Sequence, residues 1–159
     1  MIYVDMDGVL AIWDTSVTEA DTHKPGYFRK REAQKNVVEA VLILHRMNRK
    51  VTVLSHVYTD GTAREDKKVW LKENNLEDVP AIFVPYGTSK SSYLEKIGRG
   101  DVLLDDYSRN LREWEKAGAK AVKFLNGING TKGTWRGQSV NREMSPEKIV
   151  QILICVADG

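Results

Sequence analysis

The chain has 159 residues and a formal net charge of +2, and 29% of its residues are charged. This length suits one domain that buries a real core, and the balanced charge lacks the strongly basic signature of a nucleic-acid-binding protein. The one cysteine, Cys155, allows neither an intrachain disulfide nor a zinc site built on cysteines, which fits a reducing compartment. Because neither a signal-peptide pattern nor an apolar run of membrane-spanning length is present, we expect a soluble cytoplasmic protein.

Short apolar runs alternate with longer amphipathic runs along the chain. The short runs are rich in Val, Ile and Leu and lack clean polar alternation, which is typical of strands covered on both faces. They predict strands over residues 2–5, 51–55, 81–84, 102–105 and 121–125. Between them, helical spacing predicts helices over about 34–48 and 61–75, a short one near Ser89, one after Tyr107, and a last one beginning at Ser145-Pro146. This alternation predicts an open parallel sheet with right-handed crossovers, in one domain over residues 1–159.

Two stretches fall outside this alternation. Residues 12–32 mix polar and aromatic side chains, and residues 126–143 read NGINGTKGTWRGQSVNRE, rich in glycine and asparagine. Long irregular segments in a compact domain are often functional. We therefore expect a small insertion at about 12–32 and an irregular loop at 126–143.

Polar side chains follow the predicted strands. In open α/β sheets, ligands bind at the carboxyl ends of the strands, so these side chains should converge. Asp5 and Asp7 start on the same side of the first strand, where their charges repel unless a cation offsets them. The residues expected at the carboxyl ends of the strands are Asp5, Asp7, Ser55, His56, Lys90, Asp105 and Asp106.

This set of side chains suits phosphoryl transfer. Mg²⁺ takes oxygen ligands and can neutralise charge on a phosphate. One carboxylate can attack phosphorus, and a second can protonate the leaving oxygen and later activate water. A hydroxyl and a lysine can hold the remaining phosphoryl oxygens.

At this point the sequence resembles the haloacid dehalogenase superfamily of phosphatases. DMDGVL matches the first motif of that superfamily, and VTVLSH matches the second, an apolar strand that ends in Ser or Thr. Lys90 fits the third motif, and DVLLDDYSRN matches the fourth, a strand that ends in two aspartates. The motifs lie in the right order within the first 110 residues. The resemblance implies a three-layer Rossmann-like fold with a central parallel sheet and a very short cap insertion.

The resemblance also implies a role for each acidic match. Asp5 is the expected nucleophile and Asp7 the expected general acid and base. The expected ligands of Mg²⁺ are the side chain of Asp5, the backbone carbonyl of Asp7 and the side chain of Asp105. Asp106 is either a direct ligand or a support behind the ligands.

The basic and hydroxyl matches have expected roles as well. Ser55 is expected to hold the phosphoryl group, and Lys90 to neutralise charge on Asp5 and the phosphate. Lys96, later in the same segment, is a weaker rival of Lys90. His56 is expected to contact the substrate or to make a structural hydrogen bond, and a role as catalytic base is the less favoured alternative.

Within the superfamily, the chain looks most similar to 5'(3')-deoxyribonucleotidase-like proteins. The sequence segments that carry this similarity are KKVWLKENN, VPYGTSKSSYL, LLDDYSRNLREW and VKFLNGIN. Those proteins usually carry a helical cap between the first two motifs, whereas here only about residues 12–32 remain for one. The loop at 126–143, with Trp135 and Arg136, is an alternative cover for the site.

The remaining aromatic and basic residues have competing interpretations. Trp70 and Trp114 are expected to anchor packing, whereas Trp13 and Trp135 are candidates for stacking on a base. The run Arg29-Lys30-Arg31 is either a solvated face or a means of attracting an anionic substrate.

The leading prediction is a magnesium-dependent phosphomonoester hydrolase that forms an aspartyl-phosphate, acting on a nucleotide such as a nucleoside or deoxynucleoside monophosphate. The alternatives are a phosphatase for a sugar phosphate or a nucleic-acid end, and a metal-dependent binding or regulatory module that hardly turns over. The presence of Asp7, a candidate general acid, favours an enzyme. We expect a small phosphorylated partner and neither a membrane nor a nucleic acid, and the sequence leaves the oligomeric state open.

Overall fold

A computed structural model describes residues 1–130 and 134–159. The strands are β1 (Ile2–Val4), β2 (Val51–Val57), β3 (Ala81–Pro85), β4 (Val102–Asp105), β5 (Lys120–Leu125) and β6 (Gln138–Asn141). The helices are α1 (Glu19–Thr22), the 3-10 turn η1 (Phe28–Lys30), α2 (Lys35–Arg46), α3 (Ala63–Glu73), α4 (Lys90–Tyr93), α5 (Ser108–Lys116) and α6 (Pro146–Asp158). Within the described ranges, none of the helices has the length and apolar character that a membrane crossing requires.

The strands form one parallel sheet in the order β3-β2-β1-β4-β5-β6. β1 lies at the centre, where Ile2 pairs with Val51 of β2 and with Val102 of β4. The chain builds the sheet outward from β1 to β3 on one side, and then from β4 to β6 on the other. The strand order therefore reverses between β1 and β4, and such a switch point opens a crevice beyond the carboxyl ends of the strands.

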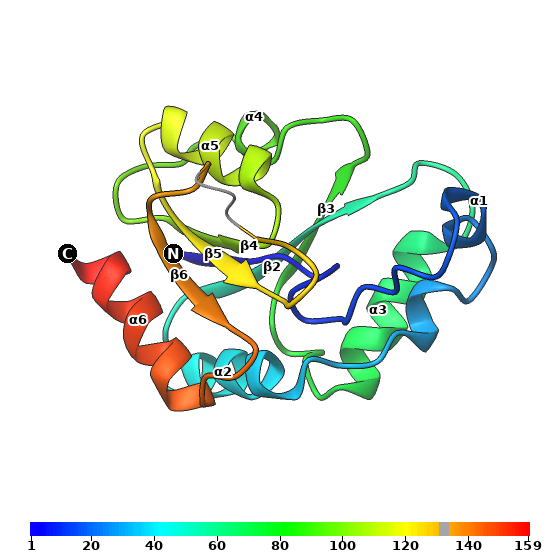
Figure 1. The fold of residues 1–159 in the computed structure, drawn as a ribbon, viewed down its shortest axis with the longest axis horizontal. Coiled ribbons are helices and arrows are strands. Elements are labelled where there is room, and N and C mark those ends of the chain that lie inside the picture. Colours follow the sequence, from blue (N-terminus) through cyan, green and yellow to red (C-terminus); the bar gives the residue numbers. More distant parts are fainter. Residues whose placement is uncertain (131–133) are drawn as a thin grey trace.

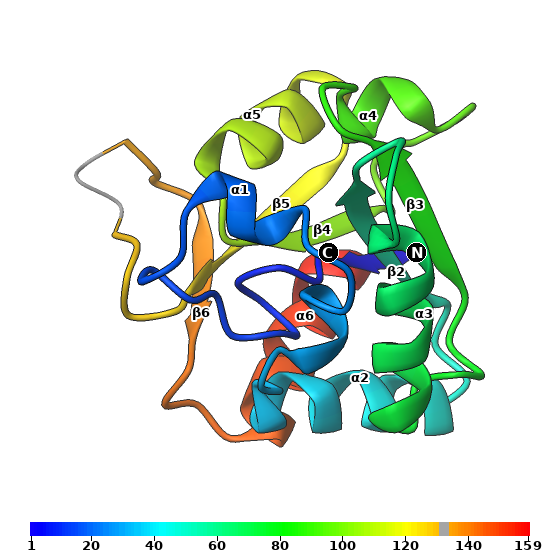
Figure 2. The ribbon, with the colours of Figure 1, turned by 90° about the vertical axis from the view of Figure 1, so that its right-hand side faces the viewer.

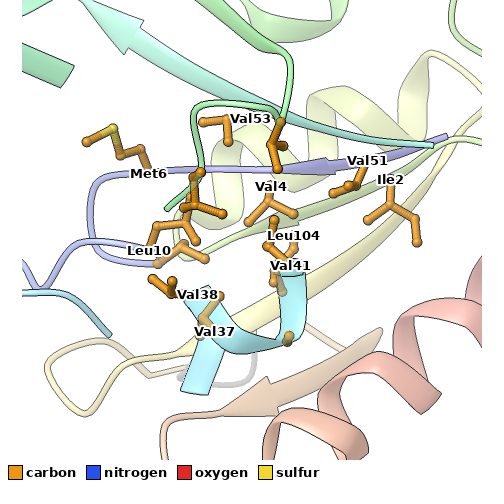
Figure 3. Close-up of a cluster of buried hydrophobic side chains, with 14 of the residues drawn as sticks. Ile2, Val4, Met6, Leu10, Val37, Val38, Val41, Val51, Val53 and Leu104 are labelled. Atoms are coloured by element: carbon orange, nitrogen blue, oxygen red, sulfur yellow. The ribbon is translucent and has the colours of Figure 1, made fainter. Parts of the chain in front are cut away.

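Helices cover both faces of the sheet and make a three-layer α/β fold (Figure 1). On one face, Ile2 and Val4 of β1 pack in a core with residues of α2, α3 and α6, part of which Figure 3 shows. On the other face, Tyr3 meets Trp114 of α5 edge to face, with ring centroids 5.1 Å apart. The alternation of β1 thus buries neighbouring side chains in two cores.

The predicted strands and helices are all present, with boundaries shifted by a few residues. The start of α6 follows its sequence signal, since the Ser145 hydroxyl accepts a hydrogen bond from the backbone N–H of Lys148 and Pro146 is the first helical residue. As predicted, Trp70 and Trp114 are buried packing anchors.

The prediction that residues 126–143 are irregular is wrong in part. β6 lies in this stretch and pairs in parallel with β5 at the edge of the sheet. Trp135 is buried in the Tyr3–Trp114 core, and its indole N–H donates to the carbonyl of Gln138 over 3.0 Å. Trp135 is therefore a packing residue, and its predicted role in stacking on a ligand is wrong. Arg136 is exposed, and the part of the predicted covering loop at 131–133 lies outside the described residues.

The segment between β1 and α2 contains α1 and η1. Single bridges join Asp7 to Ala11 and Ala11 to Ala33, so the chain makes a tight return after β1. The insertion lies at the end of the sheet to which the strands point, beside α3 (Figures 1 and 2). Two bonds fix it there: the Trp70 indole N–H donates to the carbonyl of Arg31 over 2.7 Å, and the Gly26 N–H donates to Asp66 over 2.9 Å.

Candidate active site

Asp5 lies directly after β1 at the switch point of the sheet. Its N–H donates to the carbonyl of Leu104 over 2.9 Å, which extends the pairing with β4 by one residue. The Oδ1 atom of Asp5 accepts from the N–H of Met6 at 2.7 Å and from the ammonium of Lys90 at 2.8 Å. Lys90 also donates to Asp105 at 2.7 Å, so one cation joins the carboxylates of two neighbouring strands.

Burial and charge act in opposite directions on Lys90. Burial by itself would lower the pKa of the ammonium, but Asp105 and Asp5 outweigh it and raise that pKa. Lys90 is therefore charged in the folded protein. The structure places Lys90 beside Asp5, whereas the rival Lys96 is exposed, and the catalytic role of Lys90 stays a prediction.

Three carboxylates gather at this point. Asp5, Asp105 and Asp106 each offer an oxygen, and these atoms all lie within 4.8 Å of one another. Burial, followed by the charges of Asp105 and Asp5, raises the pKa of Asp106 to about 8. Burial and the charge of Asp5 raise the pKa of Asp105 to about 6, although Lys90 opposes the shift. One lysine is thus insufficient to balance the three negative groups.

The donor set fits a hard divalent cation. Carboxylate oxygens are the ligands that Mg²⁺ prefers, and a dication would relieve the repulsion that raises these pKa values. The cluster consists of side-chain oxygens and does not include Asp7. The predicted contribution of the Asp7 backbone carbonyl stays a prediction.

The glycine of the DMDG motif makes room for Asp106. Gly8 has a φ of +77°, which L side chains rarely adopt, and a Cβ at this position would lie 2.3 Å from Oδ2 of Asp106. A side chain at residue 8 would therefore displace one of the clustered carboxylates. This contact explains physically why glycine follows the two aspartates.

Two asparagines that the sequence reasoning did not select hold Asp106 from the other side. The amide of Asn126 donates to Oδ2 of Asp106 over 3.0 Å and to the carbonyl of Gly8 over 3.1 Å. The amide of Asn129 donates to the backbone carbonyls of Asp106 and Phe124, over 2.9 and 2.8 Å. The sequence NGIN suggests a turn, and the structure adds that this turn is built onto the acidic cluster.

Asp7 lies in a different environment from Asp5. Its Oδ2 accepts from the ammonium of Lys67 at 2.5 Å, and about a quarter of its side chain, 23%, is exposed. Lys67 also donates to Ser55 Oγ over 3.0 Å and to the carbonyl of His56 over 2.7 Å. The sequence reasoning did not select Lys67, although helical periodicity places it on the buried stripe of α3 with Trp70.

His56 is held by the backbone. Its Nε2 lies 2.8 Å from the carbonyl of Thr88, and because a carbonyl only accepts, Nε2 carries the proton. Burial is the main cause that lowers the pKa of the imidazole, so the ring is neutral at pH 7. This geometry favours the structural or substrate-contacting interpretation of His56 over the role of a base.

A cavity of about 160 Å³ opens above the two aspartates. Its lining combines two acidic side chains with mainly aromatic rings: Asp5, Asp7, Trp13, Phe28, His56, Val57, Tyr58 and Tyr86. A second cavity of about 380 Å³ shares His56 and Tyr86 with the first. Its other lining residues are mostly polar: Gly87, Thr88, Ser89, Tyr107, Arg109, Asn110 and Glu113.

The basic run near the cavity is largely engaged in ion pairs. Arg29 pairs with Glu73 at 2.8 Å, and Arg31 pairs with Asp14 at 3.3 Å. Both arginines are therefore partly neutralised, which favours the interpretation of this run as a solvated face.

No protein-family model matches the chain, and no curated protein matches it. Solved structures do share its fold. One is D,D-heptose 1,7-bisphosphate phosphatase from B. bronchiseptica in complex with magnesium and phosphate, with a TM-score of 0.66, 12% identity and 97% of each chain covered. Another is D,D-heptose 1,7-bisphosphate phosphatase from Burkholderia thailandensis, with a TM-score of 0.59 and 13% identity, covering 96% of this chain and 97% of that one.

These likenesses bear on the fold rather than on the substrate. The predicted α/β fold, a three-layer Rossmann-like arrangement around a parallel sheet, is confirmed. At 12 and 13% identity, the likeness to these neighbours shows the fold alone. The closer resemblance to deoxyribonucleotidase-like proteins stays a prediction.

Proposed function

We propose that the protein is a magnesium-dependent phosphomonoester hydrolase of the haloacid dehalogenase superfamily, working through an aspartyl-phosphate on Asp5. The observation that carries this proposal is the pairing of Lys90 with Asp5, which lines a cavity together with Asp7. The fold shared with two phosphatases supports it, one of them crystallised with magnesium and phosphate. The cytoplasmic location stays a prediction.

Asp5, Asp105 and Asp106 would hold the Mg²⁺. When bound, the cation supplies positive charge that neutralises the phosphoryl oxygens. Asp105 already accepts from Lys90, the Tyr107 N–H and the Asn110 amide, at 2.7, 2.8 and 2.9 Å. Asp106 has more of its lone pairs available, and we therefore assign it as a direct ligand.

In the first step, a carboxylate oxygen of Asp5 attacks phosphorus. The bond from phosphorus to the leaving oxygen breaks, and Asp7 gives that oxygen a proton. Ser55 donates its hydroxyl hydrogen to a phosphoryl oxygen, and Lys90 balances the charge of Asp5. The products of this step are the free alcohol and a phosphorylated Asp5.

In the second step, the Asp7 carboxylate takes a proton from a water molecule that attacks phosphorus. The bond between phosphorus and Asp5 breaks, which restores the Asp5 carboxylate and releases inorganic phosphate. Asp7 regains its proton in this step, so the cycle closes without any further reactant.

We propose a nucleoside monophosphate as the substrate, because aromatic rings surround the cavity. Trp13, Phe28, Tyr58 and Tyr86 line the cavity beside the two aspartates, and the exposed rings of Trp13 and Tyr86 suit stacking on a base. Trp13 and Phe28 belong to the insertion at 12–32, and we assign this insertion the role of a small cap.

A sugar phosphate is the second candidate, and the second cavity favours it. Its hydroxyl and amide groups, among them Thr88, Ser89 and Asn110, suit the hydroxyls of a sugar that extends past His56. The neighbours in fold are named for a heptose bisphosphate.

A phosphate-release assay with and without Mg²⁺ tests the proposal. The panel contains p-nitrophenyl phosphate, nucleoside and deoxynucleoside monophosphates, and sugar phosphates, with Asp5→Asn as the test variant and Asp78→Asn, at an exposed aspartate, as the control. We expect Mg²⁺-dependent turnover that Asp5→Asn abolishes and Asp78→Asn retains. Metal-independent turnover, or turnover that survives in Asp5→Asn, would contradict the mechanism. The ranking of the nucleotides and sugar phosphates then decides between the two substrates.

A further inference from the structure

Lys67 is the most deeply buried cation beside the site. Its side chain has no exposed surface, although it is charged and belongs to a helix that otherwise carries its charged residues mostly on the outside. A buried ammonium is strongly unfavourable unless its hydrogens are all bonded. Lys67 meets this condition with three acceptors: Asp7 Oδ2 at 2.5 Å, Ser55 Oγ at 3.0 Å and the His56 carbonyl at 2.7 Å.

The acceptors of Lys67 come from two separate strands of the site. Asp7 follows β1, whereas Ser55 and His56 lie on β2. The ring of Phe28, from the insertion, covers the ammonium with its centroid 4.4 Å from Nζ. Lys67 therefore ties the proposed acid, the proposed phosphoryl-binding hydroxyl and the insertion to α3.

The contact with Ser55 fixes which way its hydroxyl can donate. Lys67 has only hydrogens to offer, so Ser55 Oγ accepts from it and keeps its own hydrogen for another partner. Within the protein, that hydrogen meets the His56 carbonyl over 3.5 Å, at the long limit of a hydrogen bond. In the proposed mechanism, this weakly held hydrogen is the one that Ser55 would donate to a phosphoryl oxygen.

The contact with Asp7 fixes the carboxylate. Lys67 engages Oδ2, so Oδ1 is the oxygen left to exchange a proton with the leaving group. We infer that Lys67 is a positioning residue, which orients Asp7 toward the leaving oxygen and Ser55 toward the phosphoryl group. This inference rests on the proposed phosphatase function and adds a residue that neither the four motifs nor the acidic cluster contains.

The dependence on the leaving group distinguishes positioning from a merely structural role. p-Nitrophenolate leaves with little need for a proton, whereas the alkoxide of a nucleoside 5'-monophosphate needs one. kcat/KM reports the steps up to departure of the leaving group. A misplaced Asp7 should therefore lower kcat/KM more for the nucleotide than for the aryl ester.

The test compares Lys67→Met with Lys68→Met on both substrates. Lys68 is the next residue of α3 but is exposed and pairs with Glu65, so its variant is the matched control. For Lys67→Met we expect kcat/KM to fall at least about tenfold more on the nucleoside monophosphate than on p-nitrophenyl phosphate, since general-acid catalysis contributes about 10²–10⁴-fold. Lys68→Met should match the wild type on both.

Thermal unfolding of each variant shows whether it folds, and Lys67→Gln provides the same comparison if Lys67→Met does not fold. Equal losses on the two substrates, a loss confined to KM, or no loss would overturn the inference while leaving the proposed function intact. A wild-type protein that hydrolyses none of the aryl, nucleotide and sugar phosphates in Mg²⁺ would instead overturn the proposed function, and this inference with it.

Discussion

Two buried lysines divide the site into halves that are built differently. Lys90 joins Asp5, directly after β1, and Asp105, the last residue of the adjacent strand β4, at the centre of the sheet. Lys67 joins Asp7 and Ser55, and its neighbourhood includes α3 and the insertion. The half proposed for the nucleophile and the metal therefore rests on the central sheet, whereas the half proposed for acid–base chemistry rests on a helix and an insertion that lines the cavity.

The largest expected effect is the loss of stability when Lys90 is removed from between its two carboxylates. Lys90→Met leaves Asp5 and Asp105 buried without their shared cation, so the free energy of unfolding should fall by about 3–5 kcal/mol in the absence of Mg²⁺. Phosphate release should be lost as well. Chemical denaturation measures the stability, and Lys96→Met, at an exposed lysine, should stay within about 0.5 kcal/mol of the wild type. A stability of Lys90→Met equal to that of Lys96→Met would contradict the interpretation that Lys90 balances the charges of Asp5 and Asp105.

A pair of glycine variants tests how closely the backbone at Gly8 packs against Asp106 in the half of the site proposed for the nucleophile and the metal. Gly8 and Gly118 both have a positive φ, but a Cβ would strike Asp106 only at Gly8 and would meet open space at Gly118. Gly118→Ala should lose about 1–2 kcal/mol of stability from its backbone alone. Gly8→Ala should lose more than Gly118→Ala and should also bind Mg²⁺ more weakly, as measured by calorimetry. Equal losses would show that Asp106 can move aside freely.

Asn126→Ala tests the support behind the acidic cluster. Removing the amide that holds Asp106 and the Gly8 carbonyl should weaken Mg²⁺ binding about 10–100-fold, the usual effect of losing a group that orients a metal ligand. Titration calorimetry measures this affinity directly. Asn36→Ala is the control, because Asn36 bonds the backbone at Arg142 and Met144 instead. An unchanged affinity would leave Asn126 as a turn residue only.

The stability of the protein is also expected to depend on pH. Because the pKa of Asp106 is raised from 3.8 to about 8 in the folded protein, its stabilising contribution is complete below its unfolded pKa and is lost as the pH rises through about 8. Without Mg²⁺, Tm should therefore fall between pH 6.5 and 8, and less so in Asp106→Asn. Saturating Mg²⁺ should remove most of this fall, since it pairs with the ionised carboxylates. A Tm independent of both pH and Mg²⁺ would contradict the cation site.

The sequence predicted those parts of the molecule that depend on local pattern. The apolar runs gave the strands from β1 to β5, and the polar residues that follow them gave the carboxylates at the sheet edge. The sequence did not predict β6, because Gln138–Asn141 is an edge strand with one fully buried side chain, Val140. Trp135 was misassigned because its burial depends on a core formed by strands far away in the sequence.

The supporting residues of the site were harder to predict for the same reason. Lys67 is one of several lysines in α3, and only the placement of that helix against β2 turns it toward Asp7 and Ser55. Asn126 and Asn129 read as turn formers, and their contacts with Asp106 exist only once β4 and β5 lie side by side. Residues that follow strands could thus be predicted from the topology, whereas residues that orient them required the packed structure.

The central claim is that Asp5 becomes phosphorylated and that Asp7 helps to remove the phosphoryl group. The most direct measurement is mass spectrometry of peptides from Asp7→Asn, quenched in acid after reaction with p-nitrophenyl phosphate and Mg²⁺. The aryl ester needs no acid to react, but hydrolysis of the intermediate needs a base. The account predicts one phosphoryl group on Asp5. A wild type that releases phosphate while Asp5 remains unmodified in Asp7→Asn would contradict it.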